Sequence, residues 1–472
     1  MRKFIVFTLF LCVFPLGSIS SFSQARRVTQ PVPTISVDAR PASALYDEAS
    51  SYATKKFQEF ASKKQPFDPK LLESTLQEQK ELAARYAAAL IARANLSLDD
   101  LYYTGLLYHL SANEERTVEL LNRFLDRDKK ATGERPQHAR FLLTLRTSQM
   151  NRFDDAEATL ADYLRFEPRK TSERVTMENA IASAYRKEKK LERAAAHAEE
   201  AFKAAKSLQP GGRNPSADRL LYTAANSLVD IYQVMKKPLS AMSSVLEEVR
   251  KLAIDSPSPR LYVDATEKLV DVLVESKRKT DAVKLVEDAI SYAKASIAPD
   301  SQRNVLHSLQ RKQKQLRLQG EIAPEITIAK WIEQAPVKIS DLRGRVVLLD
   351  FWATWCGPCL AAFPHLREWH EKYNQRGLVI LGITKYYGHG NGRQMTPSDE
   401  LGFIERFKKQ YDLPYGVAVT DNDTSHRNYG ISAIPTAVLI DRQGVIRLLT
   451  TGSGADNHIE ISAAIEKLIE EK

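Results

Sequence analysis

Two cysteines three residues apart, Cys356 and Cys359, are the residues of this chain best suited to chemistry. They belong to the pentapeptide Trp-Cys-Gly-Pro-Cys at 355–359. Cysteines at this spacing are close enough to form a disulfide, and the thiolate of one can attack a disulfide of another molecule. The third cysteine, Cys12, lies in a leader that we expect to be removed, so a disulfide scaffold is excluded. The pair predicts a redox couple.

The sequence around the cysteines predicts the elements that position them. The apolar run 346–352 is typical of a buried parallel strand. After it, apolar residues recur every three or four positions and predict a helix: Leu360, Phe363, Leu366, Trp369 and Tyr373. Cys356 would then lie at the helix N-terminus, where partial positive charge helps a thiol to lose its proton. We expect Gly357 to let the turn pass tightly and Pro358 to fix φ in the first turn.

Composition narrows the classes of partner and cofactor. The 472 residues predict two or three domains. The net charge is +9, or about +7 without the leader, and lysines and arginines form no block interleaved with aromatic residues, which argues against nucleic-acid binding. A zinc site would need two more ligands beside the cysteines, and no His-x3–5-His pair lies near them. We therefore expect no metal and no cofactor.

The N-terminal segment 1–25 predicts a signal peptide. Arg2 and Lys3 precede an apolar stretch, Phe4 to Leu16, which is short for a membrane span, and a cleavage site fits at Ala25. We expect an exported, periplasmic protein, with a tether formed by an uncleaved leader as the alternative. An oxidising compartment implies a dedicated electron source, so a membrane electron donor is expected. Residues 26–43 are rich in proline, serine and threonine and predict a disordered linker.

Residues 44–320 predict an all-α array of helical hairpins. Glycine is scarce, and a small residue recurs near the start of every second helix, with steps of 39, 38, 47 and 41 residues: Thr117, Ala156, Ala194, Ala241 and Ala282. The pattern resembles tetratricopeptide-type hairpins, which repeat in about 34 residues. Stacked hairpins leave a concave groove, so we expect a protein partner there, with a spacer or dimerisation element as the alternative.

Residues 321–472 predict a different fold class, an α/β domain with a mixed sheet and helices on both faces. Besides the strand and helix around the cysteines, we expect strands at 326–328, 337–339, 378–384, 417–419, 436–440 and 445–449 and helices at 398–411 and 458–472. A hairpin turn joins the last two strands. The glycine-rich insertion 385–397 predicts a plain surface loop, with a cover over the active site as the alternative.

This second region resembles the thioredoxin superfamily, and within it the exported TlpA/ResA-like thiol–disulfide oxidoreductases. The active-site run 351–359, the helix proline Pro364 and the segment 429–436 carry the resemblance. It implies a cis peptide bond between Ile434 and Pro435, and a client strand that pairs with the backbone of Ile434. Trp355 would offer a flat apolar contact beside the thiolate.

Two positions depart from the pattern of these oxidoreductases. Asp350 stands where they often carry asparagine; burial would raise its pKa, and it could accept the proton of Cys359. A purely structural aspartate is the alternative. Ala362 stands where many carry glutamate, which weakens any transfer of their substrate range.

The predicted mechanism is thiol–disulfide exchange. Cys356 attacks a disulfide of a client protein, and Cys359 resolves the mixed disulfide. The Gly-Pro dipeptide is that of thioredoxin, at about −270 mV, which favours a protein-disulfide reductase. The resemblance suggests the haem-attachment cysteines of c-type cytochromes as clients. The alternatives are a dithiol oxidase, with a potential above about −180 mV, a helical scaffold whose redox domain only docks, and, more weakly, a peroxidase.

Overall fold

The computed structural model describes residues 38–63, 69–209, 214–390, 393–431 and 433–471. The predicted signal peptide and most of the predicted linker lie outside these residues. The first described helix begins at Ala42, just before the predicted end of the linker. Among the described helices, none is both long enough and apolar enough to cross a bilayer.

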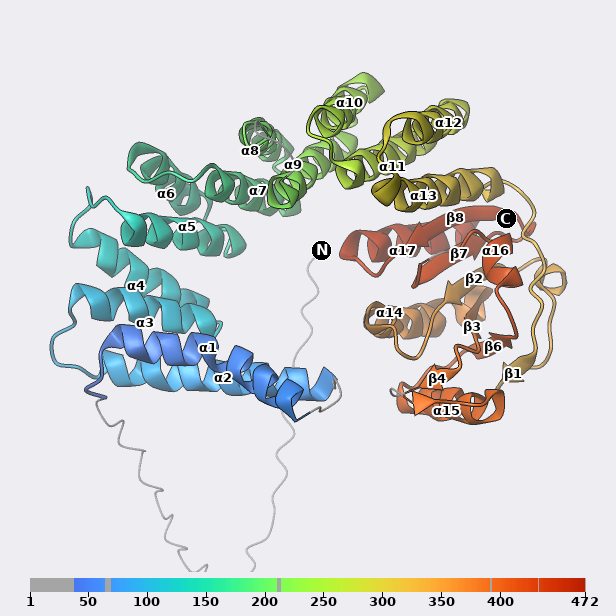
Figure 1. Ribbon diagram of the computed structural model, residues 1–472, viewed down its shortest axis with the longest axis horizontal. Helices are drawn as coiled ribbons and strands as arrows, with labels where there is room; N and C mark the ends of the chain where they lie inside the picture. Colours follow the sequence, from blue (N-terminus) through green and yellow to red (C-terminus); the bar gives the residue numbers. More distant parts are fainter. Residues whose placement is uncertain (1–37, 64–68, 210–213, 391–392, 432, 472) are drawn as a thin grey trace, which may run out of the picture.

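The first region is all-α, as predicted, and its described helices follow one another along an arch that ends above the second region (Figure 1). Successive helices pack as antiparallel pairs, and the buried side chains of α6 to α13 merge into one continuous core. The helices are α1 (Ala42–Ser62), α2 (Pro69–Ile91), α3 (Leu98–Leu110), α4 (Glu114–Asp126), α5 (Glu134–Gln149), α6 (Phe153–Arg165), α7 (Thr171–Lys187), α8 (Leu191–Lys206), α9 (Pro215–Val234), α10 (Leu239–Asp255), α11 (Pro259–Glu275), α12 (Lys279–Ser296) and α13 (Pro299–Leu318).

Five of the hairpin turns share one backbone conformation. In each turn a residue other than glycine has φ between 55° and 60°, and the amide that follows it donates to a carbonyl five residues back. This is the helix-ending arrangement in which glycine is usual. The five residues are spaced by 39, 38, 47 and 41 positions, the same steps as the predicted repeat: Ala112, Asn151, Lys189, Lys236 and Lys277.

The small residues of the predicted repeat lie where the paired helices touch, with one exception. Thr117, Ala156, Ala194 and Ala282 are fully buried. Ala241 is only half-buried, and its neighbour Met242 takes the buried place. The predicted step holds for the turn residues, but α10 begins one residue later after its turn than the equivalent helices do, so Met242 and not Ala241 is its fourth residue.

The second region is built on a six-stranded mixed sheet in the order β1-β6-β3-β2-β7-β8. Strands β2, β3 and β6 run parallel, whereas β1, β7 and β8 pair antiparallel with their neighbours. The elements are β1 (Lys330–Ile332), η1 (Ile339–Leu342), β2 (Val346–Phe351), α14 (Gly357–Tyr373), η2 (Asn374–Arg376), β3 (Leu378–Lys385), β4 (His389–Gly390), β5 (Arg393–Gln394), α15 (Pro397–Gln410), β6 (Gly416–Thr420), α16 (Thr424–Asn428), β7 (Thr436–Ile440), β8 (Ile446–Thr451) and α17 (Ala455–Glu470).

Two expectations for this region were wrong. The predicted strands at 326–328 and 337–339 do not form; β1 lies between them, and a short 3-10 helix, η1, begins at Ile339. Ile326 and Ile328 pack against one face of the sheet, so their apolar character reflects cover of the sheet and not membership of it. The carboxylate of Glu325 accepts the backbone N–H groups of Ile339 and Ser340, both at 2.9 Å, which fixes the start of η1.

Successive residues of β2 serve opposite faces of the sheet. Val346 and Leu348 pack in the core that the sheet forms with α14, α15 and α17. Val347, Leu349 and Phe351 face the other core, which η1 and the residues after α16 cover. The strand is buried along its whole length, as a central strand between two layers must be.

Backbone bonds join the two regions where the array ends. The N–H of Gly320 donates to the carbonyl of Ile446 at 2.8 Å, and the Ile446 N–H donates to Glu321 at 2.9 Å. The side-chain amide of Gln319 donates to the carbonyl of Arg447 at 3.1 Å. The last turn of the array is thus tied to the first half of β8.

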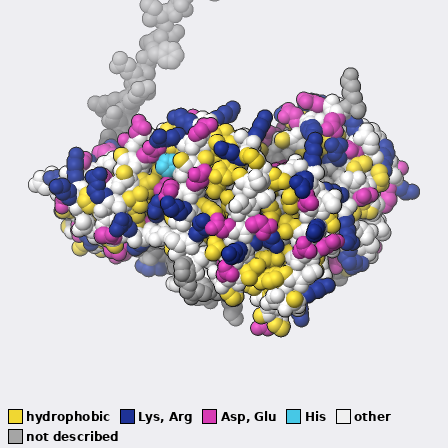
Figure 2. Space-filling view, turned by 90° about the horizontal axis from the view of Figure 1, so that it is seen from above, with side chains coloured by type: hydrophobic (Ala, Val, Ile, Leu, Met, Phe, Trp, Pro, Cys, Tyr) yellow, Lys and Arg dark blue, Asp and Glu magenta, His cyan; other side chains and the backbone are white. Residues whose placement is uncertain are grey.

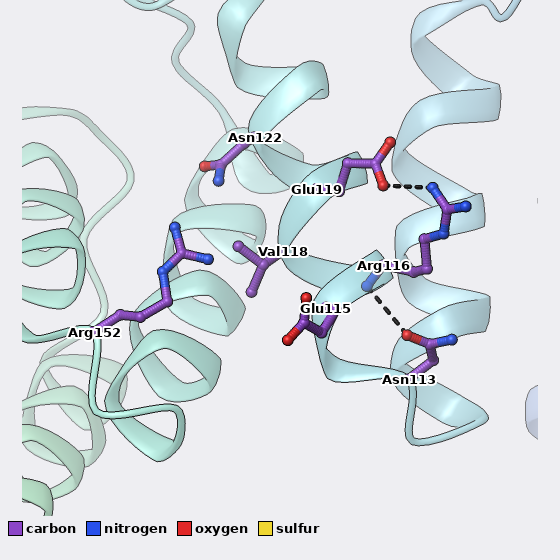
Figure 3. Close-up of a pocket in the computed structure, with 7 residues that line it drawn as sticks. All are labelled: Asn113, Glu115, Arg116, Val118, Glu119, Asn122 and Arg152. Atoms are coloured by element: carbon purple, nitrogen blue, oxygen red, sulfur yellow. Dashed lines mark hydrogen bonds and ion pairs between the residues drawn. The ribbon is translucent and has the colours of Figure 1, made fainter.

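The surface of the array is mixed in charge. Seen from above, basic and acidic side chains alternate over the face in view, without one block of either sign (Figure 2). A hollow of about 540 Å³ between α4 and the start of α6 is lined mainly by polar and charged side chains, among which Arg116 pairs with Glu119 at 2.6 Å (Figure 3). None of its lining residues is a cysteine or a histidine, so it offers no redox group.

Candidate redox site

The two cysteines lie at the junction of β2 and α14, as the sequence predicts. Cys356 is the residue that caps the helix, and its Sγ accepts the backbone N–H of Cys359 at 3.2 Å. The two residues form a disulfide, with their Cα atoms 5.2 Å apart. Both are nearly buried, Cys356 at 4% and Cys359 at 1% exposure. A helix N-terminus with a sulfur as its hydrogen-bond acceptor favours negative charge on that sulfur.

The dipeptide between the cysteines serves the helix start in only one of the two ways expected. Pro358 stands in the first turn of α14, where its missing N–H needs no partner. A Cβ atom on Gly357 would meet no atom within 4 Å, and its φ is not positive. The turn therefore does not require glycine for steric reasons, contrary to the prediction. The predicted proline Pro364 lies inside α14.

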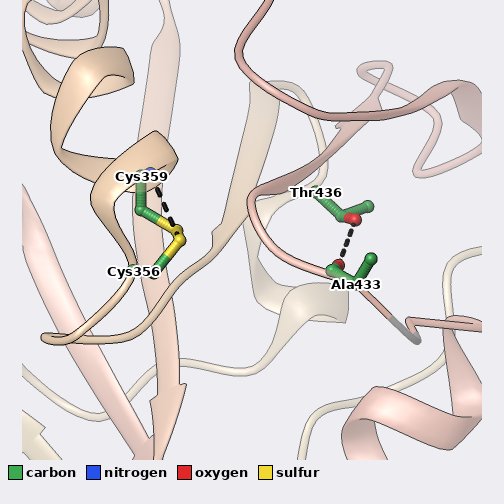
Figure 4. Close-up of a disulfide and its surroundings, with 4 residues drawn as sticks. All are labelled: Cys356, Cys359, Ala433 and Thr436. Atoms are coloured by element: carbon green, nitrogen blue, oxygen red, sulfur yellow. Dashed lines mark hydrogen bonds between the residues drawn. A yellow bond between two sulfur atoms is a disulfide. The ribbon is translucent and has the colours of Figure 1, made fainter. Parts of the chain in front are cut away.

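The loop before β7 faces the disulfide across the site (Figure 4). The peptide bond between Ile434 and Pro435 is cis, as the resemblance implied. The Thr436 hydroxyl donates to the carbonyl of Ala433 at 2.8 Å and closes this loop. Ile434 is half-buried and packs against the apolar core beneath the cysteines.

Asp350 lies on β2 with its side chain on the face that bears α14. Its Cα pairs with Gly382 of β3, and it is 4% exposed. Burial raises the pKa of the Asp350 carboxyl to about 7, as the sequence predicts in direction. A carboxyl group whose pKa lies near neutrality can both accept and return a proton at neutral pH.

Gly382 and two aromatic residues around Asp350 were not foreseen from the sequence. A Cβ on Gly382 would lie 2.9 Å from the indole nitrogen of Trp352, so only glycine fits between β3 and this fully buried ring. The Trp352 N–H and the Tyr415 hydroxyl are buried without a hydrogen-bond partner among the described residues. Burial, and then the charge of Asp350, raise the pKa of Tyr415. The carboxyl group therefore lies in a nearly dry, sparsely hydrogen-bonded environment.

The insertion 385–397 is more than a plain surface loop, because part of it packs beside the cysteines. Trp355 is 52% exposed, and the Tyr387 ring meets it edge-on, with centroids 5.2 Å apart. The His389 ring lies 6.2 Å from the Trp355 ring. The sequence showed that these rings exist, but nothing local to them indicated that they meet Trp355.

A buried carboxylate holds that segment in place. Glu400 of α15 is 2% exposed and accepts the backbone N–H groups of Tyr387 and Gly388, both at 2.8 Å. A Cβ on Gly390 would lie 2.7 Å from the Phe403 ring, so the strand β4 lies directly on α15. Tyr387 and His389 are thus fixed beside Trp355 and form one side of the site.

The described residues contain no group of three or more histidine, cysteine or carboxylate side chains placed to hold a metal ion. The chemistry that the site itself offers is therefore that of two sulfurs and one carboxyl group: formation, opening and exchange of disulfides.

Comparisons with known proteins agree with this geometry. Residues 319–449 match the model of the AhpC/TSA family. Over 128 residues the chain is 30% identical to the thiol-disulfide oxidoreductase ResA of Bacillus thuringiensis subsp. konkukian, covering 27% of this chain and 66% of that protein. It is 29% identical over 137 residues to ResA of Oceanobacillus iheyensis, covering 28% of this chain and 65% of that protein. The chain thus spans slightly less than two thirds of these relatives.

Among solved structures, a thiol:disulfide interchange protein of the thioredoxin family from Chlorobium tepidum is 20% identical, covers 32% of this chain and 97% of its own, and has a TM-score of 0.27. The family match lies in the C-terminal third of the chain, which is a thioredoxin-like domain. The ResA relatives are similar to this chain over a stretch of comparable length.

Proposed function

We propose that this chain, whose C-terminal third is a thioredoxin-like domain with ResA proteins among its relatives, is an exported protein-disulfide reductase. The observation that carries the proposal is the Cys356–Cys359 disulfide at the N-terminus of α14, opposite the cis bond before Pro435. We infer a domain division near residue 320, where the helical array ends, and we assign partner binding to the array.

The proposed reaction proceeds in two exchanges. The Cys356 thiolate attacks a disulfide of the client, one client sulfur leaves as a thiolate, and a mixed disulfide forms. The Cys359 thiol then gives its proton to the ionised Asp350 and attacks Cys356, which releases the second client sulfur. The client gains two electrons and the Cys356–Cys359 pair loses two. A dithiol electron donor, which we expect to be membrane-bound, then reduces the pair again.

The neighbouring residues support this assignment of roles. Trp355 is exposed enough to contact a client beside the reacting sulfur. The loop between Ala433 and Thr436 faces the disulfide (Figure 4), and the backbone of Ile434 within it can hold an extended client strand. Export follows from the predicted leader, and reduction from the Gly357-Pro358 dipeptide.

Insulin-disulfide reduction by the full chain tests the proposal. We expect turnover with dithiothreitol as donor, loss of that turnover in Cys356→Ser, and an isolable mixed disulfide in Cys359→Ser. The Cys356–Cys359 couple should titrate with two electrons at a potential well below about −180 mV. A higher potential would instead indicate an oxidase, and the absence of any two-electron couple would leave only a scaffold role.

A further inference from the structure

A groove of about 670 Å³ separates the helical array from the redox domain. We call it the interdomain groove. Its array side is formed by α7, α9, α11 and α13, and its other side by β8 and the start of α17. In Figure 1 these elements lie next to one another, with β8 directly beneath α13. The volume falls in the range of about 300–1,000 Å³ that is usual for ligand sites.

One end of the interdomain groove adjoins the redox site. Thr451 lines the groove, and its hydroxyl lies 3.0 Å from the hydroxyl of Thr436, the first residue of β7. The N–H of Gly452 donates to the carbonyl of Pro435 at 2.8 Å. A chain that crosses the cis-proline loop beside Cys356 can therefore continue along β8 into the groove.

The groove also contains a short free stretch of sheet edge. Strand β8 is the last strand of the sheet, and its first half is already bonded, because Ile446 exchanges backbone bonds with Gly320 and Glu321. The carbonyls of Arg447 and Thr451 also point away from β7, and the side-chain amides of Gln319 and Asn457 donate to them at 3.1 and 2.9 Å. Leu449 lies midway between them, so its backbone N–H and C=O also point away from β7. An extended chain can hydrogen-bond to such an edge.

Side chains in the groove favour an occupant with aliphatic and basic residues. Val234 and Ile459 line the groove from opposite sides and are 53% and 67% exposed. The lining includes five acidic and four basic residues, although the whole chain carries a net charge of +9. Charge and exposed apolar surface thus coincide in one place.

The basic side chains of the groove are already paired. Lys268 binds Asp230 at 2.6 Å, Arg311 binds Glu267 at 2.7 Å, Lys312 binds Asp271, and Arg186 also reaches Asp230. Among the described residues, no cation pairs with Glu275 of α11 or Glu460 of α17, one on each side of the groove. Partial loss of solvent, and then the charges of Asp271 and Glu275, raise the pKa of Glu460, whose side chain stays exposed to an incoming chain.

We propose that the interdomain groove binds an extended segment of the client that carries aliphatic and basic residues, paired as an added strand to Leu449 while the client disulfide lies at Cys356. Aliphatic side chains of the segment contact Val234 and Ile459, and its cations approach Glu275 and Glu460. This inference rests on the proposed function and names the substrate class of that site. The array then selects clients by the sequence next to their disulfide.

The test uses disulfide-bonded peptides and the full chain. Two peptides share one reactive disulfide and differ only in an adjoining segment of alternating valine and lysine or alternating valine and glutamate. We expect kcat/KM to be about 10-fold higher for the lysine peptide. The double variant Glu275→Lys/Glu460→Lys should abolish or invert that preference, whereas Glu466→Lys, also on α17 but outside the groove, should preserve it.

A backbone probe separates strand pairing from charge attraction alone. N-methylation of alternate amides in the lysine segment should lower kcat/KM about 10-fold in one register and leave it unchanged in the other, because only one register points its amides at β8. Equal loss in both registers, or no loss in either, would overturn the added strand.

A small aromatic disulfide, 5,5′-dithiobis(2-nitrobenzoate), distinguishes the two levels of failure. If the double variant still reduces it at the wild-type rate while wild type reduces both peptides equally, the groove proposal is wrong and the reductase stands. If wild type reduces neither the reagent nor the peptides, the proposed function itself fails. A dimer in sedimentation that the double variant dissociates, with peptide preference unchanged, would assign the groove to a second copy and overturn the proposal.

Discussion

The helical array and the redox domain differ in the sequence separation of the contacts that stabilise them. In the array each helix packs mainly on its sequence neighbours, and the core from α6 to α13 grows by adding one hairpin to the next. In the redox domain the central strand β2 pairs with β3, about 30 residues later, and with β7, about 90 residues later. A disturbance in the array can therefore be absorbed by one hairpin, whereas a disturbance near β2 reaches the whole sheet.

The chain carries a convenient pair of probes for this contrast. All four tryptophans, Trp331, Trp352, Trp355 and Trp369, belong to the redox domain. Tryptophan fluorescence therefore reports unfolding of that domain, while far-ultraviolet circular dichroism is dominated by the helices of the array. Comparing the two signals during urea unfolding separates effects on one region from effects on the other.

The largest expected effect is that of Asp350→Asn on the pH dependence of the redox domain. The folded-state pKa of Asp350 is raised from 3.8 to about 7, so folding favours the protonated form. The unfolded chain loses this proton near pH 4, and the folded domain only near pH 7. The free energy of unfolding should therefore fall as pH rises through this window, by at most about 4 kcal/mol.

The asparagine variant should lose most of this slope, so that the two proteins differ most above pH 7, where the variant is more stable by tryptophan fluorescence. The circular dichroism transition of the array should keep its wild-type pH dependence. The same variant should release a client from its mixed disulfide about 100-fold more slowly at pH 7, because Cys359 loses its proton acceptor. An unchanged slope would show that Asp350 titrates near its ordinary pKa.

The next effect compares one glycine from each region. A Cβ on Gly382 would lie 2.9 Å from the indole nitrogen of Trp352, a ring with no exposure and no room to move. Gly382→Ala should lower the free energy of unfolding of the redox domain by about 2–3 kcal/mol. A Cβ on Gly105 in α3 would lie 2.7 Å from the Cδ2 and 2.9 Å from the Cγ of the buried Leu121, and a shift of this one flexible side chain within the α3–α4 hairpin would relieve the contact.

Gly105→Ala also gains about 1 kcal/mol of helix propensity, so its net cost should be under about 1 kcal/mol. Urea unfolding of both variants, followed by both signals, measures the difference. If Gly105→Ala proved as costly as Gly382→Ala, the view that each hairpin relaxes by itself would be wrong.

The sequence separation of contacts also explains which features could be predicted from the sequence. The strand, the helix and the cysteines between them are contiguous in sequence, so local patterns placed Cys356 and Cys359 correctly, and the resemblance placed the cis bond before Pro435. The contact of Tyr387 with Trp355 joins segments about 30 residues apart, and no local pattern encodes it. The need for glycine at position 382 becomes visible only in the folded domain, where the Trp352 ring packs against it.

In the array the sequence predicted the repeat better than the turns. The repeat spacing was correct because it follows buried small residues such as Ala156 and Ala194. The turn residues escaped notice because Ala112 and Lys189 are not residues that usually mark a left-handed backbone. At the fourth repeat the expected small residue, Ala241, is only half-buried and Met242 takes the buried place, because alanine also occupies exposed and half-buried helix positions.

The smallest expected effect comes from exchanging alanine and glycine at turn positions with a left-handed backbone, one in each region. The array places Ala112 at φ 59°, whereas the redox domain places Gly388 at φ 74°. A left-handed backbone costs about 1 kcal/mol for a residue with a Cβ, and glycine offsets part of that gain through its larger freedom in the unfolded chain. Ala112→Gly should therefore stabilise the array by up to about 1 kcal/mol.

Gly388→Ala should destabilise the redox domain by about 1 kcal/mol, and by strain alone, because a Cβ there meets no atom within 4 Å. Each change should appear in one signal only, circular dichroism for Ala112→Gly and tryptophan fluorescence for Gly388→Ala. If the two changes in free energy of unfolding have opposite signs and similar size, both regions contain a left-handed backbone position of the same strain. They would then differ only in which residue, alanine or glycine, occupies it. If Ala112→Gly destabilised the array instead, the alanine methyl would be making a packing contribution that outweighs the strain of its backbone.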